Sequence, residues 1–409
     1  MYDFNLDFNG NPTAIHGING TGKTGILQIL GLFATDQFDR LASTDFADAK
    51  LTFQDKSDKK LVFSLERDDD GIKVYLGEGP EPKQLRVRSS NYRGDLFTAL
   101  KNSGDDDDDD VALLMHGTPT VYISTSRVSE PDGTTDDMMA SIRKRLDRSE
   151  KPPLNELVQK AKKSFGDGHH YAISRERLQL QRIRDKLVQR IADPLILDLT
   201  EQGDWSAKLN TVSKRLEKFL DPNGRPFVEI NETRLLENLA AADPSVRFGA
   251  RATIQQLENL QDTIQQGFER IQNIKSRINN YLEVLNELFQ IHPLTSKSFK
   301  INPDDNSLIC YSNKSGNQVD LAKLSSGEKE LFFIVTSATF GFDGKTPPAL
   351  LLIDEPELSL HVKWQEMLLP TLGRLNPDLQ IIVATHSPEI AGSAEPYVIS
   401  INGDDGNDL

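Results

Sequence analysis

Four short segments of the chain carry residues whose types and spacing suit phosphate chemistry. The first runs from Gly17 to Thr24 and matches G-x-x-x-x-G-K-[ST] at every constrained position. Its glycines let the backbone turn N–H groups toward phosphate oxygens, while Lys23 can reach the β- and γ-phosphates of a nucleotide. The Thr24 hydroxyl can ligate Mg²⁺. We expect the nucleotide to be bound by Asn19, Gly20, Thr21, Gly22, Lys23, Thr24 and Gly25.

Such a loop must be held between a buried strand and a helix. The residues before it, Thr13 to His16, have the pattern of a short buried strand, and the apolar residues after it recur as on one face of a helix. That helix would point the positive end of its dipole at the phosphates. The alternative, a glycine-rich turn with an unrelated lysine, does not explain these flanking elements.

The second segment places two acids at the end of an apolar run. Leu350 to Ile353 is typical of a strand buried on both faces of a parallel sheet, and Asp354 and Glu355 follow it. Buried acids are costly unless they have a partner. We expect Asp354 to hold Mg²⁺ and Glu355 to polarise the attacking water as general base. Acids are also common where a strand simply reaches solvent, but the phosphate loop elsewhere in the chain favours the catalytic interpretation.

The remaining two segments would contact the terminal phosphate. A second apolar run, residues 381–385, ends at His386, which can hydrogen-bond a γ-phosphate and so take part in catalysis. The segment from Leu324 to Glu330 precedes a helical pattern, with Ser325 at the position of a helix N-cap. A plain capping motif would also explain this serine.

Taken in order, the four segments resemble the ATP-binding-cassette ATPases. The variant Leu324-Ser-Ser-Gly-Glu328 is similar to the branch that includes SMC proteins, double-strand-break repair ATPases and bacterial RecF-like and OLD-like AAA ATPases of defence systems. The run from Glu355 to His361 is most similar to the last group. The resemblance implies that Ser325 and Gly327 contact the γ-phosphate of ATP bound by the opposite subunit. It covers roughly residues 1–130 and 295–400.

Two family features are missing from their usual places. The family has a glutamine after a middle strand, whereas here the strand pattern beginning at Val121 leads to Ser124, Ser126 and Arg127 as candidates for that position. The adenine-stacking aromatic is also unassigned. Tyr2 and Phe4 are candidates for it, and packing in the core is the other interpretation of both residues.

Composition limits the class of protein. The chain has 409 residues, 37% of them hydrophobic, one cysteine and a net charge of −15. We expect a cytoplasmic protein with no membrane partner, because the chain has no secretory signal, no apolar run of about 20 residues and no disulfide framework. The acidic balance argues against broad affinity for nucleic acid, but residues 141–190 hold 14 Lys or Arg against 6 Asp or Glu. That segment is interpreted equally well as a solvated helix face or as a DNA or RNA contact.

The expected fold is α/β: a P-loop ABC-type ATPase head with a β-rich lobe and a helical, coiled-coil insertion. Strand patterns within residues 1–130 and a strand–helix alternation in 295–409 indicate the two lobes of the head. Residues 131–294 form the insertion. There, nine of eleven heptad positions between 254 and 289 are apolar, and Gln261 and Lys275 are the exceptions. A compact helical subdomain and a projecting arm both fit this pattern.

These expectations predict a Mg²⁺-dependent ATPase whose heads dimerise around ATP. It would couple hydrolysis to nucleic acid or to a separate effector such as a nuclease, in antiviral defence or in DNA repair and chromosome maintenance. No nuclease motif stands apart from the ATP motifs, and after His386 only 23 residues remain, too few for the Toprim nuclease domain that OLD-like proteins often carry. Two other classes are an ATP-switched scaffold with little turnover and the motor of a membrane transporter, although transporter heads lack such a long helical insertion.

Overall fold

A computed structural model of the chain shows two compact units. It describes residues 4–8, 10–35, 38–41, 44, 46–54, 60–68, 71–77, 83–88, 120–124, 154–192, 204–220, 224–226, 228–291, 296–342, 344, 348–376, 378–395 and 397–401. Unit 1 comprises Met1–His169 and Asn280–Leu409, and unit 2 comprises His170–Asn279. Several residues named in the sequence analysis lie outside the described residues: Ser126, Arg127, Tyr2 and residues 141–153 of the basic segment.

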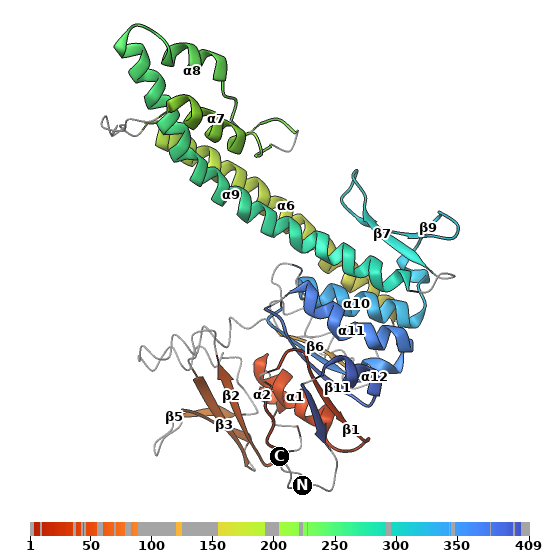
Figure 1. The fold of residues 1–409 in the computed structure, drawn as a ribbon. Helices are drawn as coiled ribbons and strands as arrows, with labels where there is room; N and C mark the ends of the chain where they lie inside the picture. Colours follow the sequence, from red (N-terminus) through yellow and green to blue (C-terminus); the bar gives the residue numbers. More distant parts are fainter. Residues whose placement is uncertain are drawn as a thin grey trace. The chain divides into compact units, whose positions relative to one another are not determined.

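A five-stranded parallel sheet forms the centre of unit 1, as the apolar runs predict (Figure 1). Its strands, in spatial order, are β12 (Val398–Ile401), β1 (Thr13–Gly17), β11 (Gln380–Thr385), β10 (Leu350–Asp354) and β6 (Thr120–Ser124). Side chains alternate between the two faces of a strand, and both sets are buried: Leu352 and Ile382 on one face, Leu351 and Val383 on the other. The sheet is therefore covered on both sides, which is why its strands are apolar throughout.

The helix after the phosphate loop lies between two sheets. Helix α1 (Lys23–Ala34) packs Leu27 against the parallel sheet and Phe33 against a second, antiparallel sheet. At Gly31 a Cβ would already come within 3.3 Å of Leu352, so α1 approaches the parallel sheet closely. Packing on both sides holds the beginning of α1, and with it the phosphate loop, in one position.

The second sheet is a four-stranded antiparallel meander in the order β2-β3-β4-β5. Its strands are β2 (Asp48–Gln54), β3 (Lys60–Asp68), β4 (Gly71–Leu76) and β5 (Lys83–Arg88), and the short helix α2 (Phe38–Leu41) precedes them. The rings of Phe33 and Phe63 meet edge to face with centroids 4.9 Å apart, which joins the meander to α1. The β-rich lobe that the sequence predicts is therefore confirmed.

The C-terminal part of unit 1 carries a small antiparallel sheet and three further helices. The sheet has strands β7 (Lys297–Ile301), β8 (Leu308–Ser312) and β9 (Gln318–Val319), and β7 and β8 pair in antiparallel fashion. The helices are α10 (Ser326–Phe340), α11 (Val362–Leu375) and α12 (Pro388–Ser393), with short 3₁₀ turns η1 (Leu321–Lys323) and η2 (Pro356–Leu358). Helix α10 is buried along almost its whole length, because it contacts β6, α11 and the ends of the two long helices.

Two long helices, α6 (Leu154–Ala192) and α9 (Pro244–Gln290), have residues in both units. Within unit 1 their ends contact α10: Phe165 and Tyr281 form an aromatic cluster with Phe340, and the Tyr281 hydroxyl lies 3.0 Å from Thr336 Oγ1. None of the described helices has both the length and the apolarity needed to cross a membrane.

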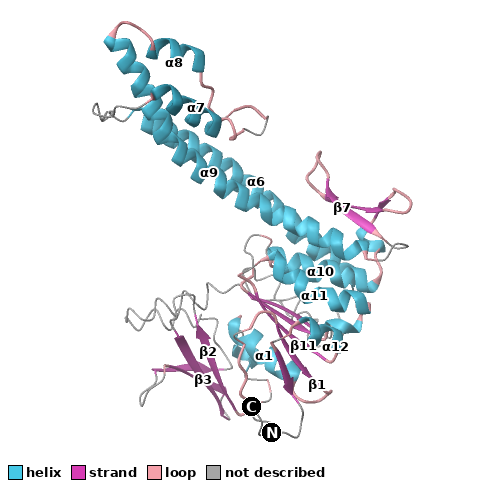
Figure 2. Cartoon of the chain, viewed as in Figure 1, coloured by secondary structure: helices cyan, strands magenta, loops and turns pink. Residues whose placement is uncertain are grey.

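Unit 2 is a helical assembly; Figure 2 draws its helices, like all helices of the chain, in cyan. Its part of α6 runs antiparallel to its part of α9, because Ile183 lies against Gly267 while Glu176 pairs with Lys275 at 2.8 Å. Two shorter helices, α7 (Trp205–Leu216) and α8 (Glu232–Leu239), complete the unit. The heptad pattern correctly predicts α9, although the helix begins ten residues before the first heptad position at residue 254, and α8 was not predicted.

Candidate nucleotide-binding and hydrolysis site

The parallel sheet brings the predicted site residues to one edge. Strand β10 lies beside β11, and β11 lies beside β1, so their carboxyl ends meet. In register, Asp354 is opposite Ala384, and His16 is opposite Thr385. Residues that follow these three strands are Ile18, Glu355 and His386. Ligands of α/β proteins bind at this edge of the sheet, and three of the four phosphate-type segments come together there.

The phosphate loop has the backbone that its glycines predict. Gly20 and Gly22 have φ angles of 84° and 93°, in the left-handed region that costs a side-chain-bearing residue energy. Helix α1 begins after Gly22 with no side chain capping its first turn, whereas α7, α8, α10, α11 and α12 each have a capping side chain. The first N–H groups of α1 therefore have no hydrogen-bond acceptor within the helix or from a capping side chain. They are free to donate to a phosphate.

Lys23 is buried at this loop. Its ammonium donates to the carbonyl oxygens of Gly17 and Ile18, both at 2.8 Å. Burial lowers the pKa of Lys23, and the carboxylates of Glu355, Glu357 and Asp354 oppose that shift. One buried cation thus lies within the field of three acids, and a bound triphosphate would add negative charge to the same place.

The two predicted Mg²⁺ ligands are adjacent although 330 residues separate them. The Thr24 hydroxyl donates to Asp354 Oδ1 at 3.1 Å. Burial raises the pKa of Asp354 to about 6, with the Thr24 hydrogen bond acting in the opposite direction and Glu355 and Glu357 adding to the rise. A hydroxyl beside a buried carboxylate is a set of hard oxygen donors, and a divalent cation there would offset the cost of burying the carboxylate. The residues therefore fit Mg²⁺.

Glu355 occupies a strained backbone conformation beside His386. Its φ angle is 53°, and its N–H donates to Ala384 O at 2.8 Å. The carboxylate lies 3.0 Å from His386 Nε2, so the predicted base and the predicted phosphate sensor contact each other directly. Left-handed backbone at a glutamate costs of the order of 1 kcal/mol and persists only where neighbouring structure enforces it.

Glu357 also belongs to this cluster, although the sequence did not single it out. Its Oε1 accepts the backbone N–H of His386 at 2.6 Å. Its Oε2 and the Nδ1 of His386 are both buried, and neither has a hydrogen-bond partner among the described residues. Unpaired buried polar atoms are uncommon in stable structures and often mark functional sites. The only sequence signal for Glu357 was its place in the acidic run after β10.

Gln365 connects the loop after β10 to the loop after β11. On one side its amide donates to Leu360 O at 2.7 Å, and on the other its Oε1 accepts from the Ser387 hydroxyl at 2.7 Å. Ser387 is the N-cap of α12, a role that Ser387-Pro388 could have indicated. Gln365 itself carried no signal, because a glutamine on a helix has no local pattern that predicts a distant partner.

The Ser325 segment forms the predicted helix start. Ser325 caps α10 in a capping box with Glu328: its hydroxyl accepts from Glu328 N at 3.4 Å, and Glu328 Oε2 accepts from Ser325 N at 2.8 Å. The other oxygen of Glu328 forms a close ion pair with Lys297 on β7. Ser325 is exposed, and Gly327 is buried. The capping interpretation is therefore correct, and it leaves the serine available on the surface.

In this single chain, the structure brings together Lys23, Thr24, Asp354, Glu355 and His386 with the loop of Asn19 to Gly25. No described residue is assigned to the position of the missing glutamine. Phe4 is not a core residue, because it is 39% exposed and its ring lies 3.3 Å from where a Cβ on Gly22 would be. Phe4 is thus beside the phosphate loop, at the surface.

Comparison with known proteins identifies the family of the chain. The chain matches the family model of an AAA ATPase domain over residues 1–391. It is 34% identical over 96 residues to the "Retron Vc95 probable ATPase" of Vibrio cholerae serotype O1 biovar El Tor, covering 22% of this chain and 19% of that protein. It is 26% identical over 133 residues to the "DNA double-strand break repair Rad50 ATPase" of Halobacterium salinarum, covering 30% of this chain and 15% of that protein.

Among solved structures, the chain resembles an Smc head domain with an extended coiled coil from Pyrococcus furiosus, which was crystallised with the C-terminal domain of ScpA. The match has 17% identity, covers 97% of this chain and 88% of that one, and has a TM-score of 0.40. The matched segments span less than a fifth of the length of the two curated relatives. Because the family model spans almost the entire chain, the protein belongs to the AAA ATPase domain family.

Proposed function

We propose that this protein is a Mg²⁺-dependent ATPase, that its heads dimerise around ATP, and that it drives a separate effector such as a nuclease in bacterial antiviral defence. The observation that carries the proposal is the convergence of Lys23, Thr24, Asp354, Glu355 and His386 at one edge of the sheet. In this proposal residues 1–130 and 295–409 form the head, residues 131–294 form the insertion, and the protein works in the cytoplasm.

Each of these residues has a task in the proposed reaction. Lys23 and the N–H groups at the start of α1 hold the β- and γ-phosphates and stabilise the charge that develops on them. Thr24 and Asp354 would hold Mg²⁺, which supplies charge neutralisation at the same phosphates when bound. Glu355 orients and polarises the attacking water, and His386 contacts the γ-phosphate while its Nε2 keeps Glu355 in place.

Exposed residues around the site support closure by a second head. Ile18 in the phosphate loop is 68% exposed, and Leu358 and Val362 beyond Glu355 are 60% and 48% exposed. Large apolar side chains on loops beside a site are typical of an interface. Ser325 is exposed as well, so a second chain could place it against the γ-phosphate. ATP would favour the closed pair because only that pair contacts the γ-phosphate from both sides.

The resemblance of residues 355–361 to defence ATPases, and the partial similarity to a retron probable ATPase, support the defence role. The partial similarity to a Rad50 ATPase favours the alternative, a role in DNA repair or chromosome maintenance.

Either role allows contact with DNA or RNA. Arg182, Arg184 and Lys186 are exposed on α6, which supports such a contact. Reversing their charge should weaken binding of duplex DNA or RNA and flatten its salt dependence; unchanged binding would favour a protein partner.

The central test uses Glu355→Gln. This variant should bind ATP, hydrolyse it at least about 100-fold more slowly, and accumulate as a dimer in size-exclusion chromatography with light scattering. Adding Ser325→Arg should abolish that dimer while leaving the monomer folded, because Ser325 is exposed. A Glu355→Gln protein that stays monomeric with ATP bound would refute the dimer. Equal slow turnover in wild type and variant would replace the enzyme with an ATP-switched scaffold.

A further inference from the structure

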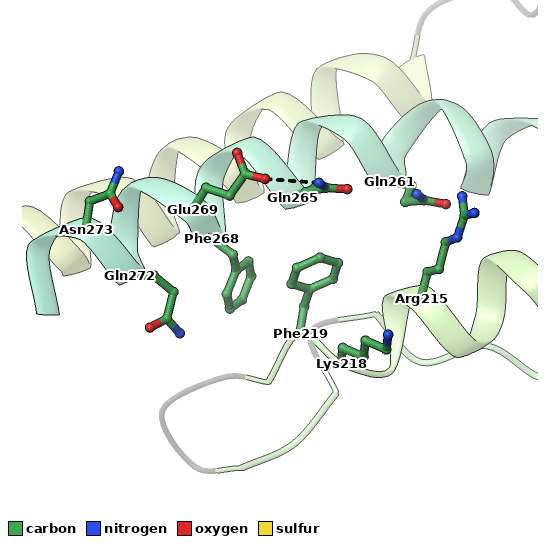
Figure 3. A pocket seen from close by; sticks show the side chains of 9 residues that line it. All are labelled: Arg215, Lys218, Phe219, Gln261, Gln265, Phe268, Glu269, Gln272 and Asn273. Carbon is green, nitrogen blue, oxygen red and sulfur yellow. Dashed lines mark hydrogen bonds between the residues drawn. The ribbon is translucent and has the colours of Figure 1, made fainter. Parts of the chain in front are cut away.

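A pocket lies in unit 2, on residues that the ATPase reaction does not use. It is formed where the chain after α7 meets the middle of α9, and its volume is about 570 Å³ (Figure 3). Pockets that hold small molecules commonly have volumes of roughly 300–1,000 Å³. The pocket is thus large enough for a ligand of the size of a nucleotide.

Two aromatic rings form the apolar part of this pocket. Phe219 and Phe268 lie with ring centroids 5.0 Å apart and an interplanar angle of 44°. Both rings are partly buried against a core cluster that includes Leu216 and Ile264, which fixes their positions. Each ring also lines the pocket, so a flat ligand could stack on the surface that the pair presents there (Figure 3).

The polar part includes a buried amide that breaks the heptad pattern. Gln261 occupies a seam position of α9, is only 7% exposed, and lines the pocket. Its amide makes no hydrogen bond to another described residue, and neither amide atom is completely shielded from solvent. The other polar exception in the same seam, Lys275, pairs with Glu176. Gln261 therefore has its amide available for a ligand in the pocket that it lines.

Positive charge borders the same pocket. Arg215 at the end of α7 and Lys218 just beyond it are both exposed and both line it. The one acid in the lining, Glu269, accepts a hydrogen bond from Gln265 at 3.0 Å. The pocket thus has two cations and one carboxylate, and that carboxylate is already hydrogen-bonded to an amide. The resulting net positive charge favours an anionic ligand.

A ligand that uses all three features needs a flat ring, hydrogen-bonding edges and an anionic group. We propose that this pocket binds a nucleoside phosphate unit, with the base against Phe219 and Phe268, its edge on Gln261, and the phosphate on Arg215 and Lys218. Amides pair with base edges, aromatic rings stack on bases, and arginine binds phosphate through two N–H groups. The unit could be a free nucleotide or one nucleotide of a single strand.

The test measures both sources on the full chain carrying Lys23→Ala, which removes the main phosphate contact of the P-loop. The probes are deoxythymidine monophosphate, followed by calorimetry, and a fluorescein-labelled twelve-nucleotide oligothymidylate, followed by anisotropy. Arg215→Gln should weaken binding about tenfold, as expected for loss of a charged hydrogen bond. Lys214→Gln is the matched control, because Lys214 is an exposed cation on the same helix that does not line the pocket.

Gln261→Leu separates binding from folding. Leucine suits the seam position, so this variant should melt no earlier than its parent while binding the probe about tenfold more weakly. If Arg215→Gln and Gln261→Leu weaken binding of the oligonucleotide alone, the ligand is a single strand. If they weaken binding of the monophosphate, the ligand is a free nucleotide. The proposal is overturned if neither probe binds, if Gln261→Leu binds as well as its parent, or if Lys214→Gln weakens binding as much as Arg215→Gln.

Discussion

Gly327 lies so close to Ser359 that a Cβ at Gly327 would overlap the Ser359 carbonyl oxygen. Gly327 belongs to the segment that begins α10, and Ser359 lies four residues beyond Glu355. The same Cβ would also come within 3.3 Å of the Trp364 ring. The glycine is therefore required within one chain, whatever it contacts in a second one, because it lets the start of α10 approach the loop that follows the catalytic strand.

Gly327→Ala should consequently destabilise the nucleotide-free monomer. Forcing a methyl group into a packed site costs about 1–3 kcal/mol, so we expect a clear fall in melting temperature before any ATP is added. Gly373→Ala is the matched control: it adds a methyl group inside α11 with open space around it and should be neutral or stabilising. If Gly327→Ala melts like wild type and only ATP-dependent dimerisation is lost, the packing role assigned here is wrong.

Lys297 should act on Ser325 through Glu328. The Lys297–Glu328 pair is largely buried, with side chains 14% and 8% exposed, and the second oxygen of Glu328 holds the backbone N–H of Ser325. Lys297→Met leaves the carboxylate without its partner, which costs about 3–5 kcal/mol when an ion pair is fully buried and somewhat less here. Chemical denaturation should show this loss in the free energy of unfolding. The double variant Lys297→Met/Glu328→Gln should recover most of the lost stability. Additive losses in the double variant would contradict the coupling.

Phe4 should contribute to the affinity for the nucleoside but not for the phosphates. It lies at the surface beside Gly22, where stacking on adenine would be worth about 1–3 kcal/mol by analogy with other base–aromatic contacts. Phe4→Ala should weaken ATP binding about tenfold and leave inorganic triphosphate binding unchanged, whereas Phe4→Tyr should bind ATP normally. Equal weakening of both ligands would show instead that Phe4 supports the loop structurally.

Cys310 should be inert to thiol reagents in the folded protein. Its side chain is buried on β8, and burial raises its pKa to about 11. Only the thiolate reacts, and at pH 8 about one molecule in a thousand would carry it. We expect no reaction with Ellman's reagent at pH 8 in native buffer and one thiol per chain in denaturant. Rapid native reaction at pH 8 would mean that the β7–β8–β9 sheet opens readily.

The sequence predicts the chemistry of the site because that chemistry depends on local pattern. A local pattern of about ten residues is enough to predict each of three features. They are the turn at Gly20 and Gly22, the helix start at Lys23 and the buried strand before Asp354. Parallel strands align their carboxyl ends, so the meeting of Thr24 and Asp354 could be predicted as well, despite their separation along the chain.

Other features depend on contacts between segments with no pattern in common. The packing of α10, α11 and the small sheet determines three such contacts. They are the pairing of Lys297 with Glu328, the hydrogen bond between Gln365 and Ser387, and the approach of Ser359 to Gly327. The heptad pattern likewise identified Gln261 only as an exception. Its place in a pocket follows from the packing of Phe219 beside α9, because long-range packing, and not local spacing, decides which side chains share a cavity.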